Sequence, residues 1–421
     1  MLSEALKTIN LRGNSLGTEG WCAIFAALRD NKENKVESWD LSGERINVKV
    51  AKVLAEYVSG SAVLTSLDVR DNEIGSTGAA AIAEALRGNE VLTELNIGGN
   101  KICPEGGVAI GKALAVNGVL KTLNLCFNNI GEEGATAIGE ALRGNAALTD
   151  LNLGKNKIGD KGAAALAIAE SLRGNAVLKS INLSGNSIGA EGWCAIFAAL
   201  RDNKKNKIES WDLSRQGINV EVAKVLAEYV SGSGVLTALD LARSGIDEAG
   251  AVALASALRV NAVLKTLDLY NNQIRAEGAA AIVEALRGNA VLTTLVLSYN
   301  GIGPSGATAI AEALQGNEML TDLNLYWNKI GDEGATAIAE ALRGNAVLKN
   351  LNLYYNNIGN TGAIAIAEAL RGNAVLQSID LRCNNIDGKV KRFSTFFGRN
   401  GNGKEVIRDA VSGRVGFELK M

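Results

Sequence analysis

The feature that most constrains this chain is a 28-residue unit that repeats along almost its whole length. The unit that starts at Leu320 reads LTDLNLYWNKIGDEGATAIAEALRGNAV, and it restarts at Leu348 as LKNLNLYYNNIGNTGAIAIAEALRGNAV. A self-similar period of this length is typical of stacked repeats, in which each unit buries its core only against its neighbours. The sequence therefore predicts one solenoid, although 421 residues would otherwise suggest two or three globular domains.

The first part of the unit predicts a short strand with one buried face. Leu323 and Leu325 are two residues apart, so both point to the same side of the strand. Asp322, Asn324 and Tyr326 point to the other side. We therefore expect a strand with a leucine face in the core and a polar face in solvent.

The second part of the unit predicts a turn and an amphipathic helix. Asn328 lies where the chain leaves the strand, and we expect its amide to bond backbone groups of its own turn and of the next coil. Residues 331–334 are the predicted turn into a helix over 335–342, which has one apolar stripe. Acidic residues in this turn suit the positive end of the helix dipole. Gly344 is expected to end the helix in a left-handed conformation.

The pattern Leu320-x-x-Leu323-x-Leu325-x-x-Asn328-x-Ile330 resembles the leucine-rich repeat in its 28-residue, ribonuclease-inhibitor-like form. The resemblance covers residues 6–386. It implies an α/β horseshoe of about 14 repeats, with a parallel β-sheet on the concave face and helices on the convex face. Strands are expected to start near Leu6, Val36, Leu64, Leu92, Leu120, Leu148, Leu178, Ile208, Leu236, Leu264, Leu292, Leu320, Leu348 and Leu376.

The two ends of the predicted solenoid differ. Only five residues precede the first strand, at 6–11, so we expect this end to be continued in a longer protein, closed by a partner, or poorly capped by its own repeat. Residues 1–386 form the predicted solenoid, and 387–421 form a predicted capping segment with a short helix at 404–411. The apolar residues expected to cover the last coil are Val390, Phe393, Phe396 and Phe397.

One block of the sequence occurs twice. Residues 19–64 match residues 191–236, and only seven of the 46 positions differ, which indicates duplication without a functional meaning of its own. Trp39 and Trp211 replace a strand leucine in the two copies, so both are expected in the core.

Other substitutions in this block alter the repeat. Trp21 and Trp193 begin helices, and we expect them to be partly buried. The turn asparagine is replaced by Glu44, by Gln216 and, one repeat later, by Ser244. These coils are expected to lose the amide bond to the backbone and to be irregular or flexible.

Composition excludes several classes of function. The net charge of −2 predicts no strong attraction to nucleic acid or to a membrane, and the sequence has neither a secretory signal nor a long apolar run. Histidine is absent, which removes the commonest general base and metal ligand. Five cysteines, an odd number without a CxxC pair, indicate free thiols in a reducing, cytoplasmic compartment. We predict no cofactor, no metal and no enzymatic activity, and the oligomeric state stays open.

Two segments nearly match a phosphate-binding P-loop. Residues 106–113 and 398–405 each have glycines before a lysine, but both lack the Ser or Thr that holds magnesium. In register with the other repeats the first segment is a helix, and the second is expected to be a flexible turn. Neither is predicted to bind a nucleotide.

One column of polar strand positions alternates between asparagine and aspartate. Paired carboxylates could indicate acid–base chemistry or calcium, but adjacent strands lie only about 5 Å apart. We therefore interpret the column as a structural ladder of side chains. It consists of Asn10, Asp40, Asp68, Asn96, Asn124, Asn152, Asn182, Asp212, Asp240, Asp268, Val296, Asn324, Asn352 and Asp380.

Clustered aromatic residues are the best candidate for a binding site. They follow the last strand leucine in four consecutive coils, where earlier coils carry glycine or serine and, as one exception, Phe127. Exposed aromatic clusters are typical of binding hot spots, and the alternative is that the rings only stack on one another. The predicted site consists of Tyr270, Tyr299, Asp322, Tyr326, Trp327, Tyr354 and Tyr355.

The leading hypothesis is a non-catalytic scaffold that binds a protein partner on its concave face. The resemblance extends to the repeat domains of NLR-type receptors, so one form of this hypothesis makes the chain the sensor part of such a receptor. An alternative is a GTPase activator similar to Ran GTPase-activating protein, for which Arg12 or Arg70 is a candidate loop arginine, although the acidic tail of that family is missing. A ribonuclease-inhibitor role is the third possibility, against which the low charge and the few cysteines argue.

Overall fold

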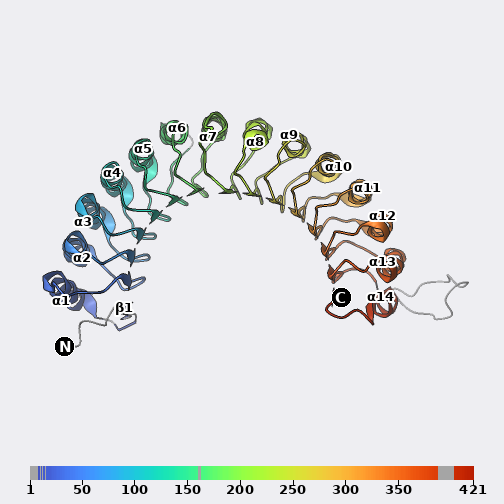
Figure 1. The fold of residues 1–421 in the computed structure, drawn as a ribbon, viewed down its shortest axis with the longest axis horizontal. Helices are drawn as coiled ribbons and strands as arrows, with labels where there is room; N and C mark the ends of the chain where they lie inside the picture. The colour runs from blue at the N-terminus through green and yellow to red at the C-terminus, as the bar shows by residue number, and fades with distance from the viewer. Residues whose placement is uncertain (1–7, 10, 12, 15, 160–162, 387–402) are drawn as a thin grey trace, which may run out of the picture. The chain divides into compact units, whose positions relative to one another are not determined.

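The computed structural model describes all of the chain except residues 1–7, 10, 12, 15, 160–162 and 387–402. The chain divides into two compact units, residues 1–212 and 213–421. Within each unit, short parallel strands alternate with helices in sequence order, and strands and helices lie on opposite sides (Figure 1). No helix in the described part of the chain is long and apolar enough to cross a membrane.

The N-terminal unit consists, in its described residues, of eight strands and seven helices. Each strand pairs in parallel with the next one along the chain. The strands are Thr8–Ile9 (β1), Ser38–Asp40 (β2), Ser66–Asp68 (β3), Glu94–Asn96 (β4), Thr122–Asn124 (β5), Asp150–Asn152 (β6), Ser180–Asn182 (β7) and Ser210–Asp212 (β8). The helices are Gly17–Asp30 (α1), Val48–Gly60 (α2), Gly75–Gly88 (α3), Cys103–Leu114 (α4), Gly131–Leu142 (α5), Ala163–Leu172 (α6) and Ala190–Asp202 (α7).

The C-terminal unit has the same alternation, again with parallel pairing between consecutive strands. Its strands are Ala238–Asp240 (β9), Thr266–Asp268 (β10), Thr294–Val296 (β11), Asp322–Asn324 (β12), Asn350–Asn352 (β13), Ser378–Asp380 (β14) and Glu418–Lys420 (β15). Its helices are Val220–Gly232 (α8), Glu248–Leu258 (α9), Arg275–Leu286 (α10), Gly303–Leu314 (α11), Gly331–Gly344 (α12), Asn360–Gly372 (α13) and Gly403–Val411 (α14). These elements confirm the predicted α/β solenoid with a parallel sheet.

The core of each repeat lies between its strand and its helix. Leu323 is 2% exposed and Leu325 is fully buried, as the two-residue periodicity predicts. The helix is longer than predicted, because residues 331–334 form its first turn rather than a separate connection. Gly334 allows the close packing of neighbouring helices, since a Cβ atom there would lie 2.6 Å from the Cβ atom of Ala307.

The turn asparagine bonds the backbone of its own turn as predicted, but its amide reaches the preceding coil and not the next one. Asn328 is fully buried, and its Nδ2 donates to the carbonyl oxygens of Leu297 in the preceding coil and of Leu325 in its own, at 2.9 and 3.0 Å. Its Oδ1 accepts from the backbone N–H of Asn300, at 2.9 Å. The side chain therefore joins two coils and leaves none of these buried backbone groups unpaired.

A second asparagine corrects the prediction for the end of the helix. Gly344 is the last residue of α12, and its φ angle is not positive. Asn345 follows in an extended conformation; its Nδ2 donates to the carbonyl of Leu314 at 2.8 Å, and its Oδ1 accepts from the N–H of Leu348 at 2.8 Å. Asn345 therefore caps the preceding helix α11, and Nδ2 of Asn373 does the same for α12 by donating to the carbonyl of Leu342 at 2.7 Å.

The tryptophans of the duplicated block are all buried. Trp39 and Trp211 are in the core as predicted, each 2% exposed. Trp21 and Trp193 were expected to be partly buried, but they are 1% and 0% exposed because each stacks on a phenylalanine one helical turn later. Their indole rings therefore fill core space between helix and strand rather than bordering solvent.

The coils that lack the turn asparagine keep more bonds than predicted. The Ser244 hydroxyl donates to the carbonyl of Leu213 at 2.6 Å, the kind of contact that the asparagine makes. The Gln216 amide donates to the carbonyl of Ser214 at 2.8 Å, and a Glu44 carboxylate oxygen accepts from the N–H of Gly13 at 2.7 Å. The prediction that these coils lose the hydrogen bond to the backbone is therefore wrong for Ser244. It is partly confirmed for Gln216, whose amide bonds only its own coil.

The C-terminal tail continues the sheet beyond the repeats. The predicted short helix exists as α14, which packs against α13 and buries Ile407. Strand β15 was not predicted; it pairs with β14, with Glu418 opposite Ser378. The apolar residues Val390, Phe393, Phe396 and Phe397 and the second glycine-rich segment up to residue 402 lie outside the described residues. The first P-loop-like segment is part of α4, as its register predicts.

Candidate functional site

Side chains of the polar column form hydrogen bonds to the backbone of the aromatic residues that follow each strand. In β12, Oδ1 of Asn324 accepts a hydrogen bond from the backbone N–H of Tyr326 at 3.1 Å. Asn352 makes the same bond to Tyr354, and Asp268 makes it to Tyr270, at 2.9 and 2.7 Å. The common contact of the column is thus a hydrogen bond from a side chain to the backbone two residues later, which stabilises a turn within one coil. A cross-strand hydrogen bond of the kind that the predicted ladder requires joins Asn96 and Asp68 at 3.1 Å.

Six aromatic side chains of the C-terminal unit lie together after the carboxyl ends of β10 to β13. We call them the aromatic ridge, and they form two rows. The first row is Tyr270, Tyr326 and Tyr354, and the second row is Tyr299, Trp327 and Tyr355. The ridge contains every aromatic residue of the predicted site.

The second row is a continuous stack. The ring centroids of Tyr299 and Trp327 are 5.2 Å apart at an interplanar angle of 27°, and those of Trp327 and Tyr355 are 3.8 Å apart at 4°. Each residue occupies the same register position in successive repeats, so the spacing of the strands sets the spacing of the rings. The alternative interpretation, that the rings stack on one another, is therefore correct as a description of their contacts.

The first row ends in arginine at both ends. The Arg243 guanidinium lies 5.3 Å from the centre of the Tyr270 ring, and that of Arg382 lies 5.4 Å from the centre of the Tyr354 ring. Both distances are in the range of cation–π contacts. Arg382 is held in place by Asp380, whose two carboxylate oxygens accept from it. Neither arginine was predicted to belong to the site, although alignment of the repeats places Arg382 one repeat after Tyr354.

The ridge is partly open to solvent and uncharged. Tyr299 and Tyr355 are 39% and 40% exposed, whereas the other four rings are half-buried. Burial raises the pKa of the Tyr326 phenol, and the charges of neighbouring tyrosines would raise it further. The hydrogen bond between the Tyr354 hydroxyl and the Cys383 sulfur, at 3.2 Å, raises the pKa of Tyr354. Both phenols therefore stay neutral at neutral pH and present hydroxyl groups to a partner.

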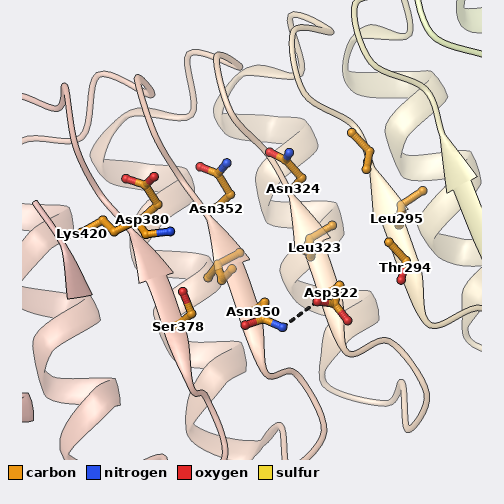
Figure 2. Close-up of a pocket in the computed structure, with 12 residues that line it drawn as sticks. Thr294, Leu295, Asp322, Leu323, Asn324, Asn350, Asn352, Ser378, Asp380 and Lys420 are labelled. Atoms are coloured by element: carbon orange, nitrogen blue, oxygen red, sulfur yellow. Dashed lines mark hydrogen bonds between the residues drawn. The ribbon is translucent and has the colours of Figure 1, made fainter. Parts of the chain in front are cut away.

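A shallow groove runs across the strands beside the ridge, and we call it the strand groove. Its volume is about 190 Å³, and strands β11 to β15 form its floor. Figure 2 shows its polar side chains in two rows, with Asn324, Asn352 and Asp380 in the row nearer the ridge. Asp322, the non-aromatic residue of the predicted site, lies in the other row and accepts from Nδ2 of Asn350 at 2.6 Å.

The structure also shows the contacts of Phe127 and Arg70, two residues that the sequence singled out. Phe127 is 62% exposed in the N-terminal unit, where Lys155 lies over its ring at 5.0 Å. Nε of Arg70, a candidate loop arginine, lies 3.5 Å from the Asp68 carboxylate. Arg12, the other candidate, lies outside the described residues.

Comparison with known proteins supports the repeat assignment. The family described as "Leucine Rich repeat" matches residues 60–83, 88–111, 116–139, 144–167, 174–196, 235–255, 260–283, 288–311, 316–339 and 344–367. No curated protein sequence matches the chain.

The solved structures to which the chain is similar include two that match about a third of its length. The actin-binding site 2 of leiomodin-1 is 24% identical, with a TM-score of 0.32, over 35% of this chain and 86% of that one. The C-terminal domain of tropomodulin from Caenorhabditis elegans is 16% identical, with a TM-score of 0.31, over 36% of this chain and 90% of that one.

Stacked strand–turn–helix units with an open strand face define a solenoid of the kind that binds other proteins. The chain belongs to the leucine-rich repeat family, because the ten matched segments together cover more than half of it. Proteins of this kind are generally non-catalytic binding scaffolds, so a protein-interaction scaffold is the class of function that the repeats indicate.

Proposed function

We propose that the aromatic ridge, together with the strand groove, is the surface through which this repeat protein binds a protein partner. The leucine framework is shared by all repeats and serves folding, whereas the ridge is confined to four coils. Large aromatic side chains that stay partly exposed are the commonest anchors of protein interfaces. A stacked row also holds its side chains in one arrangement, which lowers the entropy lost on association.

The observation that carries this proposal is the stack of three large aromatic rings in the second row. Tyr299, Trp327 and Tyr355 have φ angles of 61°, 57° and 54°, in the left-handed region. At the same register position, Gly99 and Gly185 have φ angles of 67° and 68°, and the polar residues Asp71, Lys155 and Asn271 are left-handed as well. Glycine adopts this conformation without strain, whereas a bulky residue there costs roughly 1–2 kcal/mol. The conformation belongs to the repeat, and what distinguishes the second row is that three consecutive coils place large, partly exposed rings there.

The same register gives a test that preserves the fold. Trp327→Gly introduces the residue of Gly99 and Gly185, and Tyr326→Ser introduces the residue of Ser298. We expect the double variant to fold, since both new residues occupy these positions in other coils and Trp327→Gly removes left-handed strain. It loses the ring contacts with Tyr299, Tyr354 and Tyr355, which are worth about 0.5–1.5 kcal/mol each. The measurement is affinity capture from an extract of the source organism, with bound proteins quantified by mass spectrometry for wild type and variant.

We expect at least one protein to be captured by wild type in an amount at least about tenfold higher than by the double variant. A tenfold loss is the size of effect expected when one interface hot spot is removed. Phe127→Gly is the matched control, because it removes an exposed ring at the same register position in the other unit. Capture should be unchanged in that control. A partner captured equally by wild type and by the double variant would contradict a binding site at the ridge.

A further inference from the structure

The second row of the ridge has one open end. In the next repeat, the register position after Tyr355 is Cys383, whose backbone has the same left-handed φ angle of 57°. Its side chain is too short to cover a ring, and its thiol is turned toward the Tyr354 hydroxyl at 3.2 Å. In the described part of the chain the stack therefore ends at Tyr355, whose side chain is 40% exposed.

The first row shows which group this unit places against the end of an aromatic row. Arg243 covers Tyr270 and Arg382 covers Tyr354, each with its guanidinium about 5 Å from the ring centre. A planar guanidinium suits this position because it stacks on a ring face while its N–H groups remain free to donate. Arg382 cannot also cover Tyr355 without leaving Asp380, to which it donates three hydrogen bonds.

The strand groove contains one carboxylate without a cation of the same chain. Asp380 is paired with Arg382, and Lys420 is paired with Glu418 at 3.1 Å. Asp322 instead accepts hydrogen bonds from Asn350 and from the Thr321 hydroxyl, both at 2.6 Å, and makes no ion pair with any described residue. The groove is therefore left with one negative charge that a partner can balance.

We infer that the partner presents a basic segment, with an arginine whose guanidinium stacks on the open face of Tyr355 and a second cationic side chain that reaches Asp322. This inference rests on the proposed function and specifies the chemistry of its partner. The Asp322 carboxylate repels phosphate groups, and the charge of Arg382 beside Tyr354 is balanced by Asp380. A basic protein segment therefore fits this end of the surface better than a nucleic acid.

Fluorescein-labelled hexa-arginine, hexa-lysine and hexa-citrulline peptides are suitable probes, with fluorescence anisotropy at low salt as the measurement. We expect hexa-arginine to bind more tightly than hexa-lysine, and hexa-citrulline to bind least, because citrulline keeps the shape of arginine without its charge. Tyr355→Leu should weaken hexa-arginine about two- to five-fold, the range for one exposed cation–π contact. Asp322→Asn should weaken both basic peptides by about the same factor.

Three further variants separate this site from general attraction. Tyr355→Phe keeps the ring and should bind hexa-arginine as wild type does. Cys383→Arg supplies a guanidinium from the chain itself and should weaken binding about two- to five-fold. Phe127→Leu removes an exposed ring of the other unit and should have no effect.

Equal affinities for hexa-arginine and hexa-lysine, or an unchanged affinity in Tyr355→Leu, would overturn the inference. Tighter binding of an oligothymidylate than of hexa-arginine would overturn it as well. Suppose that capture of a partner depends on Trp327 but that the partner contacts Tyr355 with an acidic or uncharged segment. That result would refute the inference of a basic segment and leave the proposed function intact. Loss of the dependence on Trp327 would refute both.

Discussion

At the scale of single residues, the turn asparagine explains how the coils are joined. Asn328 donates to three carbonyl oxygens and accepts from two backbone N–H groups, all without contact with water. Each buried group left without a partner would cost about 1–3 kcal/mol, so an apolar side chain cannot replace the amide. This role could be predicted from sequence because it depends only on a backbone path that every repeat shares.

The strain in the second row could not be predicted in the same way. Residue type alone identifies Tyr299, Trp327 and Tyr355 as large and aromatic, and it does not give their φ angles. Likewise, residue type does not show that the Arg243 side chain lies over the Tyr270 ring of the next coil, since that contact depends on a side-chain rotamer. The ridge was therefore predictable as a cluster, whereas its stacking and its arginine ends required the structure.

Asp268 allows a prediction about pH. Burial raises the pKa of its carboxyl, and Asp240, directly opposite on β9, raises it further, while the hydrogen bond from the Tyr270 N–H lowers it. Because this pKa is higher in the folded state than in the unfolded state, the charged form of Asp268 lowers the free energy of unfolding above the folded-state pKa. This loss of stability disappears once the pH falls below the unfolded-state pKa of about 3.9, where the carboxyl is protonated in both states. Asp268→Asn keeps the bond to Tyr270, so we expect it to stabilise the protein at pH 7 by up to about 1 kcal/mol.

Urea unfolding followed by circular dichroism, repeated between pH 3 and pH 7, measures this difference. The gain in Asp268→Asn should be full at pH 7, shrink as the pH falls through the folded pKa and vanish near pH 3. A variant that is less stable than wild type at pH 7, or a gain that does not change with pH, would show that the charge of Asp268 is not the cause.

At the scale of elements, α13 and α14 each begin with a hydrogen bond to the coil before it. Oδ1 of Asp332, in the first turn of α12, accepts from the N–H groups of Gly359 and Gly362 at the start of α13, at 2.7 and 2.8 Å. Asn360 repeats this one coil later by accepting from Gly403 at the start of α14, at 2.8 Å. The sequence placed acidic residues correctly at the start of a helix. It could not show that one of them caps the next helix, because that contact lies 30 residues away along the chain.

This arrangement predicts unequal effects for two neighbouring acidic residues. Asp332→Ala removes the cap of α13 and should lower the free energy of unfolding by about 1 kcal/mol, the usual cost of losing a helix cap. Glu333→Ala removes an acidic side chain from the same turn of α12 without breaking that cap, so it controls for the helix dipole. Urea midpoints compare the two variants, and equal losses would argue against capping between coils.

At the scale of the whole molecule, repetition explains why the strands and the buried leucines could be predicted from the sequence. The strand pattern and the buried leucines recur in nearly every unit, so each correct residue assignment was confirmed by its copies. The tail beyond residue 386 occurs once and offers no such comparison. Strand β15 was missed for that reason, since a three-residue strand is recognisable only from the neighbour with which it pairs.

The tail predicts how the last repeat is stabilised. Ile407 of α14 is fully buried, and Arg371 of α13 is bonded to Asp409 at 3.3 Å, while β15 pairs with the edge of β14. If the tail caps the repeats, Ile407→Ala should lower the free energy of local opening by about 2–5 kcal/mol, the cost of truncating a buried isoleucine. Hydrogen–deuterium exchange should then become faster in α13 and β14. Val415→Ala, at a fully exposed site of the same tail, is the matched control. Equal exchange in the two variants would mean that the last repeat is stable without its tail.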